Sequence, residues 1–455
     1  MDKPIKSTYS SKSFLKFFIP SLLGVLIFMT PMMHNGEITI PIAIISKLLQ
    51  NSISAYIPTI LTILIVLSTA VSILVKVLQP SFIVNHKYLN SLFNLSPLWF
   101  VCRILGAVII TMVLLQVGPE FIWSPDTGGM LVNDLLPVLF AVFLFAGLFL
   151  PLLLNFGLLE LFGSLLSKVM RPIFTLPGRS SIDCITSWLG DGTIGVLLTG
   201  KQYEEGHYTK REAAVISTTF SAVSITFSLV IISQVGLGHL FVPFYLTVTI
   251  AGIVAAIVIP RIPPLSKKSD TYIDGSEKVE KEIIPEGYSP LKWGIKNAVD
   301  RAEQNTSITE FFVEGIKNVL DMWIGVLPVV VAMGTIALII ATYTPVFKIL
   351  GAPFIPFLNL LQIPEATAAS QTILVGFADM FLPSVLASGI SSELTRFVIA
   401  ALSVTQLVYM SEIGGLLLGS KIPVNLKDLI LIFLTRTIVT LPVISLCAHL
   451  LFKFV

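Results

Sequence analysis

The chain has 455 residues, of which 54% are hydrophobic and 12% charged, and its mean hydropathy is +0.88. Soluble proteins carry about twice that share of charged residues, so the composition excludes a soluble globular protein and predicts a polytopic membrane protein in a lipid bilayer. The net charge is +2, and no run rich in Lys and Arg is interleaved with aromatic residues, which argues against nucleic acid as a partner.

Nine apolar segments are long enough to cross a hydrocarbon core of about 30 Å, which takes roughly 20 helical residues. These spans are predicted at 14–33, 56–78, 97–117, 133–155, 212–234, 239–259, 319–343, 395–419 and 427–451. A further apolar piece between Ile38 and Leu49 contains Pro41 and is too short to cross. We expect that piece to be re-entrant or to lie at the membrane interface.

The distribution of Lys and Arg predicts the orientation of these spans, because short loops rich in these residues stay in the cytoplasm. With the N-terminus inside, the basic region 156–211 falls inside, and the 118–132 loop, which has acidic residues and no Lys or Arg, falls outside. The polar segment 261–318 is expected to be a cytoplasmic linker that ends in an amphipathic helix near 308–318. The predicted location is the bacterial cytoplasmic membrane, with a cytoplasmic N-terminus.

Two halves of the chain show the same order of features. The first reads LPGRSS, WLGDGTIGVLLTG and KREAAVISTTFSAVSITFS, and the second reads QIPEATA, GFADMFLPSVLASG and LTRFVIAALSVTQLVYMSE. Asp191 of the first aligns with Asp379 of the second. Each middle segment is too irregular for one crossing and too short for two, which predicts a re-entrant helical hairpin. Three spans separate the hairpins, so the repeats are predicted to have inverted topology.

The predicted fold class is therefore an all-α polytopic membrane protein with two inverted repeats, each made of a re-entrant hairpin and a spanning helix. N-terminal spanning helices occupy 1–155, and the first repeat occupies 156–260, with its hairpin at about 180–200. The linker and amphipathic helix occupy 261–318. The second repeat occupies 319–455, with its hairpin at about 366–390.

At the two hairpin segments the sequence resembles a known family. LPGRSSIDCITSWLGDGTIGVLLTGKQYEEGHYTKREAAVISTTFSAVSITF in one half, and GFADMFLPSVLASG with VTQLVYMSEIGGLLLGS in the other, resemble the nucleoside-recognition, or Gate, domain group. More closely, they resemble the YjiH family of bacterial inner-membrane proteins. The resemblance covers roughly 150–451. It implies a transport fold with paired hairpins and does not fix the substrate, because the group's relatives differ in what they move.

Asp191 and Asp379 are the leading candidates for a site, because an ionisable group at bilayer depth is costly and usually faces a cavity or a partner. The alternative is a helix cap at the hairpin tip, and capping and solute binding can coexist. Further candidates for binding the solute are Thr193, Ser384, Gln406, Tyr409 and Glu412. Glu412 is expected to exchange a proton or neutralise a cation, unless it lies at the cytoplasmic end of its span and is merely hydrated.

The span after the first hairpin carries a series of hydroxyls. Ser217, Ser221, Ser224 and Ser228 recur at i, i+4, i+7 and i+11, which would place them on one helix face. Ser217, Ser221 and Ser224 are candidates for binding an ion such as Na⁺. The alternative interpretation is close helix packing, for which small residues are favoured in membranes.

These features favour a secondary transporter of a small polar solute, either nucleoside-like or amino-acid-like and peptide-like, coupled to Na⁺ or H⁺. No GxxxxGK[ST] motif is present, no cofactor or metal is expected, and a homo-oligomer is left open. One alternative is a non-transporting membrane scaffold or a partner subunit of a Gate-type complex. An intramembrane enzyme is disfavoured. Asp191 lies in WLGDG rather than in a GxGD motif, and neither a Tyr-Asp pair nor HExxH occurs.

Overall fold

The computed structural model describes residues 10–30, 32–34, 37–189, 192–220, 223, 225–278, 284–285, 288–305 and 307–454. These residues are almost entirely helical, apart from one antiparallel ribbon of β1 (Met32–His34) and β2 (Glu37–Thr39) and an isolated bridge. Within them, seven helical runs are apolar and long enough to cross a membrane: Ser11–Met29, Ile57–Leu78, Pro97–Leu115, Glu120–Leu154, Gly238–Lys267, Ile308–Tyr343 and Leu426–Lys453. The chain is an all-α polytopic membrane protein.

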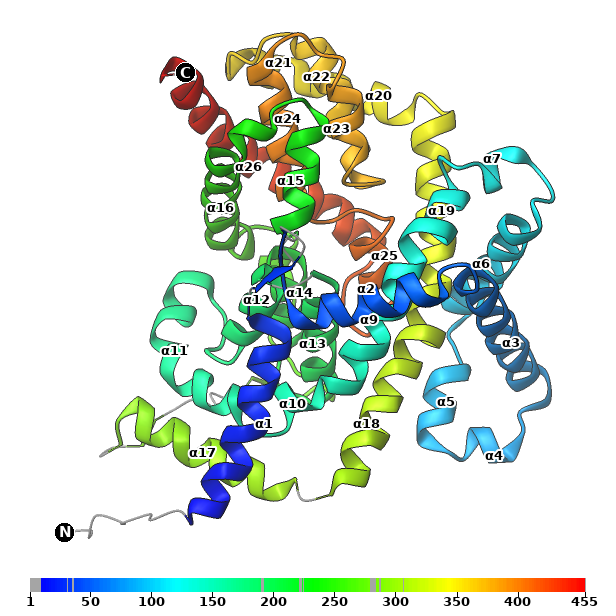
Figure 1. Ribbon diagram of the computed structural model, residues 1–455, viewed down its shortest axis with the longest axis vertical. Coiled ribbons are helices and arrows are strands. Elements are labelled where there is room, and N and C mark those ends of the chain that lie inside the picture. Colours follow the sequence, from blue (N-terminus) through cyan, green and yellow to red (C-terminus); the bar gives the residue numbers. More distant parts are fainter. Residues whose placement is uncertain are drawn as a thin grey trace.

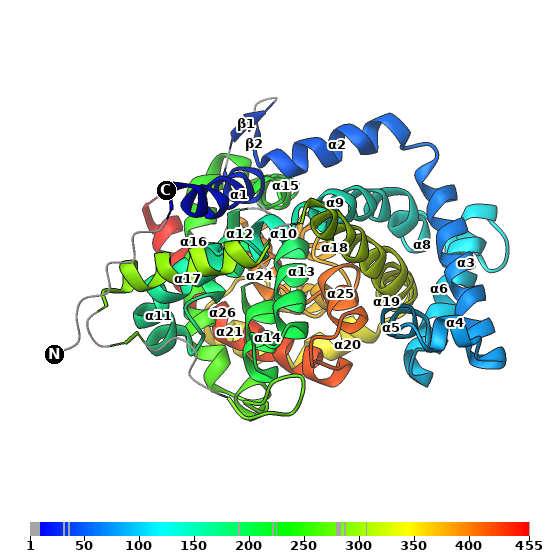
Figure 2. The ribbon, with the colours of Figure 1, turned by 90° about the horizontal axis from the view of Figure 1, so that it is seen from below.

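The N-terminal part contains α1 (Ser11–Met29), α2 (Pro41–Ile53), α3 (Ile57–Leu78), α4 (Ser81–Val84), α5 (Lys87–Phe93) and α6 (Pro97–Leu115). It continues with α7 (Glu120–Trp123), α8 (Gly128–Met130), the π-helix η1 (Leu131–Leu135), α9 (Leu136–Phe149) and α10 (Pro151–Leu154). The short apolar piece predicted near residues 38–49 forms α2, which runs across the direction of α1 and packs on α9 (Figures 1 and 2).

The middle of the chain contains α11 (Leu158–Phe174), α12 (Ser180–Leu189), α13 (Gly192–Glu204), α14 (Lys210–Thr219), α15 (Ile225–Gln234), η2 (Gly238–Leu240), α16 (Phe241–Val258), η3 (Ile259–Arg261) and η4 (Leu265–Lys267). Helices α12 and α13 pack on each other as the two arms of a hairpin. The two helices cover the range predicted for the first hairpin, α13 extends to Glu204, and the re-entrant character of this hairpin stays a prediction.

The C-terminal part contains α17 (Pro290–Gln304), α18 (Ile308–Leu320), the π-helix η5 (Asp321–Val326), α19 (Leu327–Tyr343), α20 (Val346–Gly351), η6 (Ala352–Phe354) and α21 (Ile355–Leu360). A second hairpin follows, made of α22 (Ala366–Ile373), η7 (Val375–Phe377) and α23 (Leu382–Ala387). The last elements are α24 (Glu393–Gln406), α25 (Ile413–Gly419) and α26 (Leu426–Phe454). The helix expected near 308–318 is α18, and it continues through η5 into α19.

Seven of the nine predicted spans are helices of membrane-crossing length, and the other two predictions are wrong. The spans predicted at 212–234 and 395–419 are not continuous, because α14 ends at Thr219 before α15 begins at Ile225, and α24 ends at Gln406 before α25 begins at Ile413. Neither interruption contains Gly or Pro. The second is held open by contacts with other elements, which a helix prediction from local sequence does not include.

The two hairpins lie in different halves of the molecule, with α12 and α13 in the lower half of Figure 1 and α22 and α23 at the top. Each interrupted helix reaches the other hairpin with its second half, since α15 packs against α23 and α25 packs against α13. Each hairpin therefore packs against the second half of the interrupted helix that follows the other hairpin. The buried residues of both parts form one continuous apolar core.

Candidate functional site

Asp379 stands between the two arms of the second hairpin and is 7% exposed. Its Oδ1 accepts hydrogen bonds from the backbone N–H groups of Phe381, over 2.8 Å, and Leu382, over 3.3 Å, at the start of α23. Its Oδ2 accepts a hydrogen bond from the Ser411 hydroxyl over 2.7 Å. One carboxylate thus caps a helix of the hairpin and binds the interruption between α24 and α25.

The main chain also joins this hairpin to the second interruption. The N–H of Met410 donates to the carbonyl of Phe377 over 2.8 Å, and the N–H of Ser411 donates to that of Ala378 over 2.9 Å. Buried backbone groups need partners, and a helix interrupted inside an apolar core leaves several without one. The hairpin supplies these partners, which explains how an interruption without Gly or Pro is stable.

Gln406, the last residue of α24, clamps the second hairpin to α26. Its Nε2 donates to the carbonyl of Ile373 over 3.1 Å and to the Thr437 hydroxyl over 2.9 Å. A Cβ placed on Gly376 would collide with Gln406 Oε1, so a side chain at this position would have to shift the Gln406 amide from its two hydrogen bonds. The breaker-rich stretch 374–389 therefore has a packing role as well as a conformational one.

The residues of the second interruption carry two more of the candidate groups. The Tyr409 hydroxyl lies 3.3 Å from Glu412 Oε2, and Glu412 is the residue immediately before α25. A carboxylate at that position is favoured by the positive end of the helix dipole. Leu407 opens the interruption with a left-handed backbone, φ +59°. Ser384 lies apart from this group, because its hydroxyl donates to the carbonyl of Phe381 within its own turn over 2.6 Å.

The first interruption separates the serines predicted to share one helix face. Ser217 is buried near the end of α14, where its hydroxyl donates to the carbonyl of Ala213, and Ser228 lies beyond the interruption on α15. The prediction that these serines share one helix face is therefore wrong, because the helix that would carry them is not continuous. Ser221 and Ser224 lie outside the described residues, as does Asp191.

Arg436, near the middle of α26, joins the two interruptions and is fully buried. Its Nε and Nη2 both donate to the carbonyl of Thr405, over 3.0 and 2.8 Å. Its Nη1 lies 3.5 Å from the carbonyl of Thr218 and 3.4 Å from that of Thr219. These carbonyls belong to the last turns of α24 and α14, so one guanidinium contacts the C-terminal ends of both helices.

A buried acid also binds the arms of the first hairpin to each other. Asp183 on α12 accepts hydrogen bonds from Thr199, over 3.0 Å, and from Gln202, over 2.5 Å, both on α13. Arg179 Nε in turn donates to Gln202 Oε1 over 2.8 Å. The chain of contacts keeps the hairpin closed from its middle to its outer end.

The loop that follows α13 places a histidine against this outer end. Arg179 Nη1 lies 3.0 Å from His207 Nδ1, and His207 Nε2 lies 3.6 Å from Glu205 Oε2. Arginine is only a donor, so Nδ1 is the acceptor and the ring is neutral in this contact. Burial lowers the pKa of His207, and the charge of Arg179 lowers it further, while Glu205 acts in the opposite direction.

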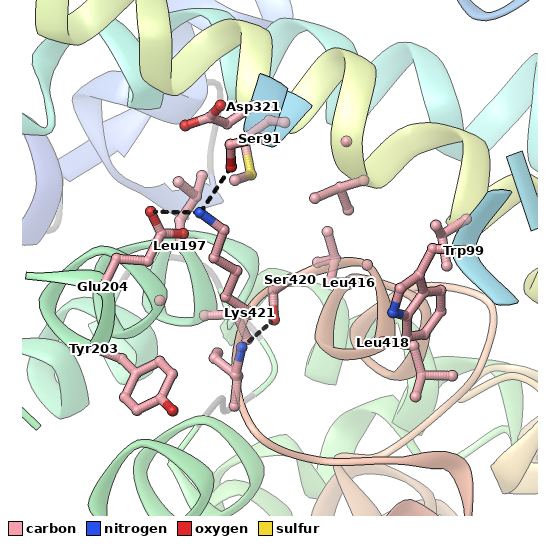
Figure 3. A pocket seen from close by; sticks show the side chains of 18 of the residues that line it. Ser91, Trp99, Leu197, Tyr203, Glu204, Asp321, Leu416, Leu418, Ser420 and Lys421 are labelled. Atoms are coloured by element: carbon pink, nitrogen blue, oxygen red, sulfur yellow. Dashed lines mark hydrogen bonds and ion pairs between the residues drawn. The ribbon is translucent and has the colours of Figure 1, made fainter. Parts of the chain in front are cut away.

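A cavity of about 580 Å³ opens between the first hairpin and the rest of the molecule (Figure 3). Its walls come from α5, α6, α13, η5, α19 and α25. Of the candidate residues, Thr193 lines it from α13. None of Asp379, Gln406, Tyr409 and Glu412 lines it, so the candidate residues are divided between this cavity and the second interruption. Pockets of a few hundred cubic ångströms are the size that small-molecule ligands occupy.

A chain of ion pairs crosses one side of this cavity. Lys201 of α13 lies 2.8 Å from Asp321 of η5 and 3.7 Å from Glu204. Lys421, after α25, lies 3.6 Å from Glu204 and donates to the Ser91 hydroxyl over 3.3 Å (Figure 3). These contacts connect the first hairpin to η5, and the segment after α25 to α5, through partly exposed charges.

A second buried arginine lines the cavity from α6. Arg103 is 1% exposed, and it donates to the Ser72 hydroxyl over 2.7 Å and to the carbonyls of Leu92 and Ile324 over 3.1 and 2.8 Å. The cavity therefore has polar groups on opposing walls. Within the described ranges, no three His, Cys, Asp or Glu side chains lie close enough together to hold a metal ion.

Comparisons with known proteins agree with this arrangement. A family model described as nucleoside recognition, named Gate, matches residues 136–238, which hold the first hairpin and the first interrupted helix. An uncharacterized protein of Alkalihalophilus pseudofirmus is 53% identical over 447 residues, or 98% of this chain and 96% of that protein. The chain contains a Gate domain and belongs to the same family as that protein. No solved structure matches it.

The match to the Gate domain confirms the resemblance seen in the sequence, and the YjiH-like subfamily stays a prediction. The Gate domain is associated with transport rather than catalysis, and together with the apolar helices it makes this chain a transporter-like membrane protein. The matched region ends before the second hairpin, so Asp379 and the second interruption are assigned from the structure and not from the family match.

Three residues of the site were missed in the sequence, namely Asp183, Ser411 and Arg436. Asp183 and Ser411 carry no distinctive local pattern. Arg436 does, because it lies at the middle of the span predicted at 427–451, and a charge inside an apolar span marks a functional candidate. The rule that selected Asp379 should have selected Arg436 as well.

Proposed function

We propose that this protein is a secondary transporter that moves a small polar solute, nucleoside-like or amino-acid-like and peptide-like, across the bacterial cytoplasmic membrane. A gradient of Na⁺ or H⁺ would drive the movement, and the N-terminus would lie in the cytoplasm. The single observation that carries this proposal is the junction of the second hairpin with the interrupted helix α24–α25. It joins Asp379 to Ser411 and pairs main-chain polar groups of the two elements inside an apolar core.

The physical argument is that irregular backbone at membrane depth is tolerated only where protein buries it or where it faces a polar cavity. Interrupted helices of this kind recur in secondary transporters, where their ends face the solute and the coupling ion. The same order of hairpin, interrupted helix and long helix occurs twice in the chain. The crossed packing of α15 on α23 and of α25 on α13 supports inverted repeats related by a two-fold axis.

In this proposal the two candidate regions have different roles. The second interruption, with Asp379, Ser411, Tyr409 and Glu412, supplies oxygens that hydrogen-bond a solute, and Glu412 carries a proton or neutralises a cation. The cavity beside the first hairpin gives access from one side of the membrane. Alternating access then requires the first hairpin to move relative to η5.

Uptake into proteoliposomes under imposed Na⁺ and H⁺ gradients tests the proposal. Nucleosides, amino acids and short peptides would be screened with the wild type, Asp379→Asn and a matched control, Asp126→Asn, which replaces an exposed acid. We expect gradient-dependent uptake of at least one solute class, reduced in Asp379→Asn and unchanged in Asp126→Asn. If no solute accumulates above empty vesicles, the transporter proposal is wrong; if Asp379→Asn takes up solute as well as the wild type, the binding role of Asp379 is wrong.

A further inference from the structure

The C-terminal ends of two interrupted helices meet inside the protein. α14 ends at Thr219 and α24 ends at Gln406, and the carbonyls of their last turns converge on one point. The last carbonyls of a helix have no partner within it, and the aligned peptide dipoles place about half a negative elementary charge at that end. Two such ends therefore present roughly one negative charge inside the protein.

The side chain at this point is the guanidinium of Arg436, which bears one positive charge. Arg436 is fully buried, and no carboxylate lies within ion-pair distance of it among the residues that the structure describes. A buried charge without compensation is strongly unfavourable. The two helix ends are the compensation, and their combined charge is close to that of the guanidinium.

We propose that Arg436 is a resident cation that occupies a cation-binding site made by the two interrupted helices. Carbonyl ends of interrupted helices are places where transporters coordinate a coupling Na⁺ or H⁺. Here the chain fills that place with its own side chain. One consequence, which rests on the proposed function, is that a coupling cation is bound elsewhere than at these carbonyls.

The space around Arg436 supports this assignment. A cavity of about 20 Å³ adjoins the guanidinium and is lined by Trp188, Thr219, Tyr245 and Thr249. Trp188 Nε1 and Thr219 Oγ1 have no hydrogen-bond partner among the described residues. The volume suits a single water molecule, which these two groups would bind, and leaves no room for a hydrated ion beside the arginine.

A packing role for Arg436 predicts different behaviour from a charge role, and three substitutions separate them. Arg436→Lys keeps the charge, Arg436→Met keeps an unbranched apolar stem without the charge, and Arg436→Ala removes both and leaves a space. Phe433→Ala is the matched control, because Phe433 is a large buried side chain one turn away on the same helix. It opens a space without removing a charge.

The experiment measures the melting temperature of the full-length protein in detergent, at constant ionic strength, in choline chloride, NaCl or methylguanidinium chloride. We expect Arg436→Met and Arg436→Ala to melt about 5 °C or more below the wild type, and Arg436→Lys to lose less. Methylguanidinium should raise the melting temperature of Arg436→Ala in a saturable way and leave Phe433→Ala unchanged. Any stabilisation of the wild type by NaCl relative to choline chloride should be kept in Arg436→Lys, because a coupling Na⁺ is bound elsewhere than at these carbonyls.

Several outcomes would overturn the assignment. These are Arg436→Met being as stable as Arg436→Lys, methylguanidinium acting equally on Arg436→Ala and Phe433→Ala, or a saturable Na⁺ stabilisation of the wild type that Arg436→Lys loses. The comparison of the wild type with Arg436→Lys decides even if Arg436→Met or Arg436→Ala does not fold. Because the readout is stability, a failure of the uptake experiment leaves these results in force, and the two proposals fail separately.

Discussion

Replacing Asp379 distinguishes a helix cap from a group that binds the solute. Its Oδ1 caps α23 by accepting hydrogen bonds from two backbone N–H groups, and its Oδ2 accepts a hydrogen bond from the Ser411 hydroxyl. Asp379→Ala removes a cap worth about 1 kcal/mol and a charged hydrogen bond worth roughly 1.5–3 kcal/mol, so we expect a loss of about 2–4 kcal/mol. Asp379→Asn keeps an acceptor for the cap and should lose less than about 1 kcal/mol.

The assay compares thermal unfolding with uptake for the same set of variants. If Asp379 only caps the hairpin, uptake should follow stability, and Asp379→Asn should transport nearly as well as the wild type. If its charge contacts the solute or a cation, Asp379→Asn should stay folded and lose most of its uptake. The reasoning from geometry is refuted if Asp379→Ala is as stable as the wild type, because the three hydrogen bonds would then contribute nothing.

Ser411→Ala completes this test. The hydroxyl has no role in capping α23, so its loss should destabilise the protein by about 1–2 kcal/mol and leave the hairpin folded. In a double-mutant cycle with Asp379→Ala, the two effects should be less than additive, since both remove the same hydrogen bond. Strict additivity would show that the contact between the hairpin and the interruption has no energetic weight.

Three further predictions follow from other contacts. Gly376→Ala should cost about 1–3 kcal/mol, because a Cβ would collide with the glutamine at the end of α24, while Gly389→Ala, which meets no atom within 4 Å, should be nearly neutral in the same melting assay. A bis-thiosulfonate cross-link between Lys201→Cys and Asp321→Cys, long enough to span the ion pair, should stop uptake until a reductant is added, and uptake that continues through the cross-linked protein would contradict movement of the first hairpin. Burial lowers the pKa of His207, so the folded state takes up this proton less readily than the unfolded chain. Stability should fall as the pH drops below the ordinary histidine range, near 6.5, and the fall should be weaker in His207→Gln; equal slopes in melting experiments would show that this ring does not titrate with folding.

The hairpins could be placed from the sequence because their signals are local. Gly376, Pro383 and Gly389 interrupt an apolar segment around Asp379, and this combination is unusual in a helix. The structure puts η7 and α23 within that stretch. Seven of the spans could also be predicted from the sequence, since length and hydropathy alone decide whether a helix can cross a bilayer.

The interruptions could not be placed in this way. Residues 220–224 read FSAVS and 407–412 read LVYMSE, and neither stretch contains a residue that breaks helices. The second is interrupted because the carbonyls of Phe377 and Ala378, which are distant in sequence, accept its N–H groups. A periodicity argument assumed a continuous helix and therefore placed four serines on one face.

Two charged residues inside apolar spans, Arg436 and Glu412, are the feature of the sequence that is related to these interruptions. Breaking one helix into α24 and α25 creates a new C-terminal end and a new N-terminal end within an apolar core, and a continuous helix has neither. The chain places Arg436 against the first of these ends and Glu412 at the second. Each charge has the sign opposite to the dipole end that it meets. A continuous helix would have no use for either charge, so an arginine and a glutamate in two successive apolar spans indicate together that one of those spans is interrupted.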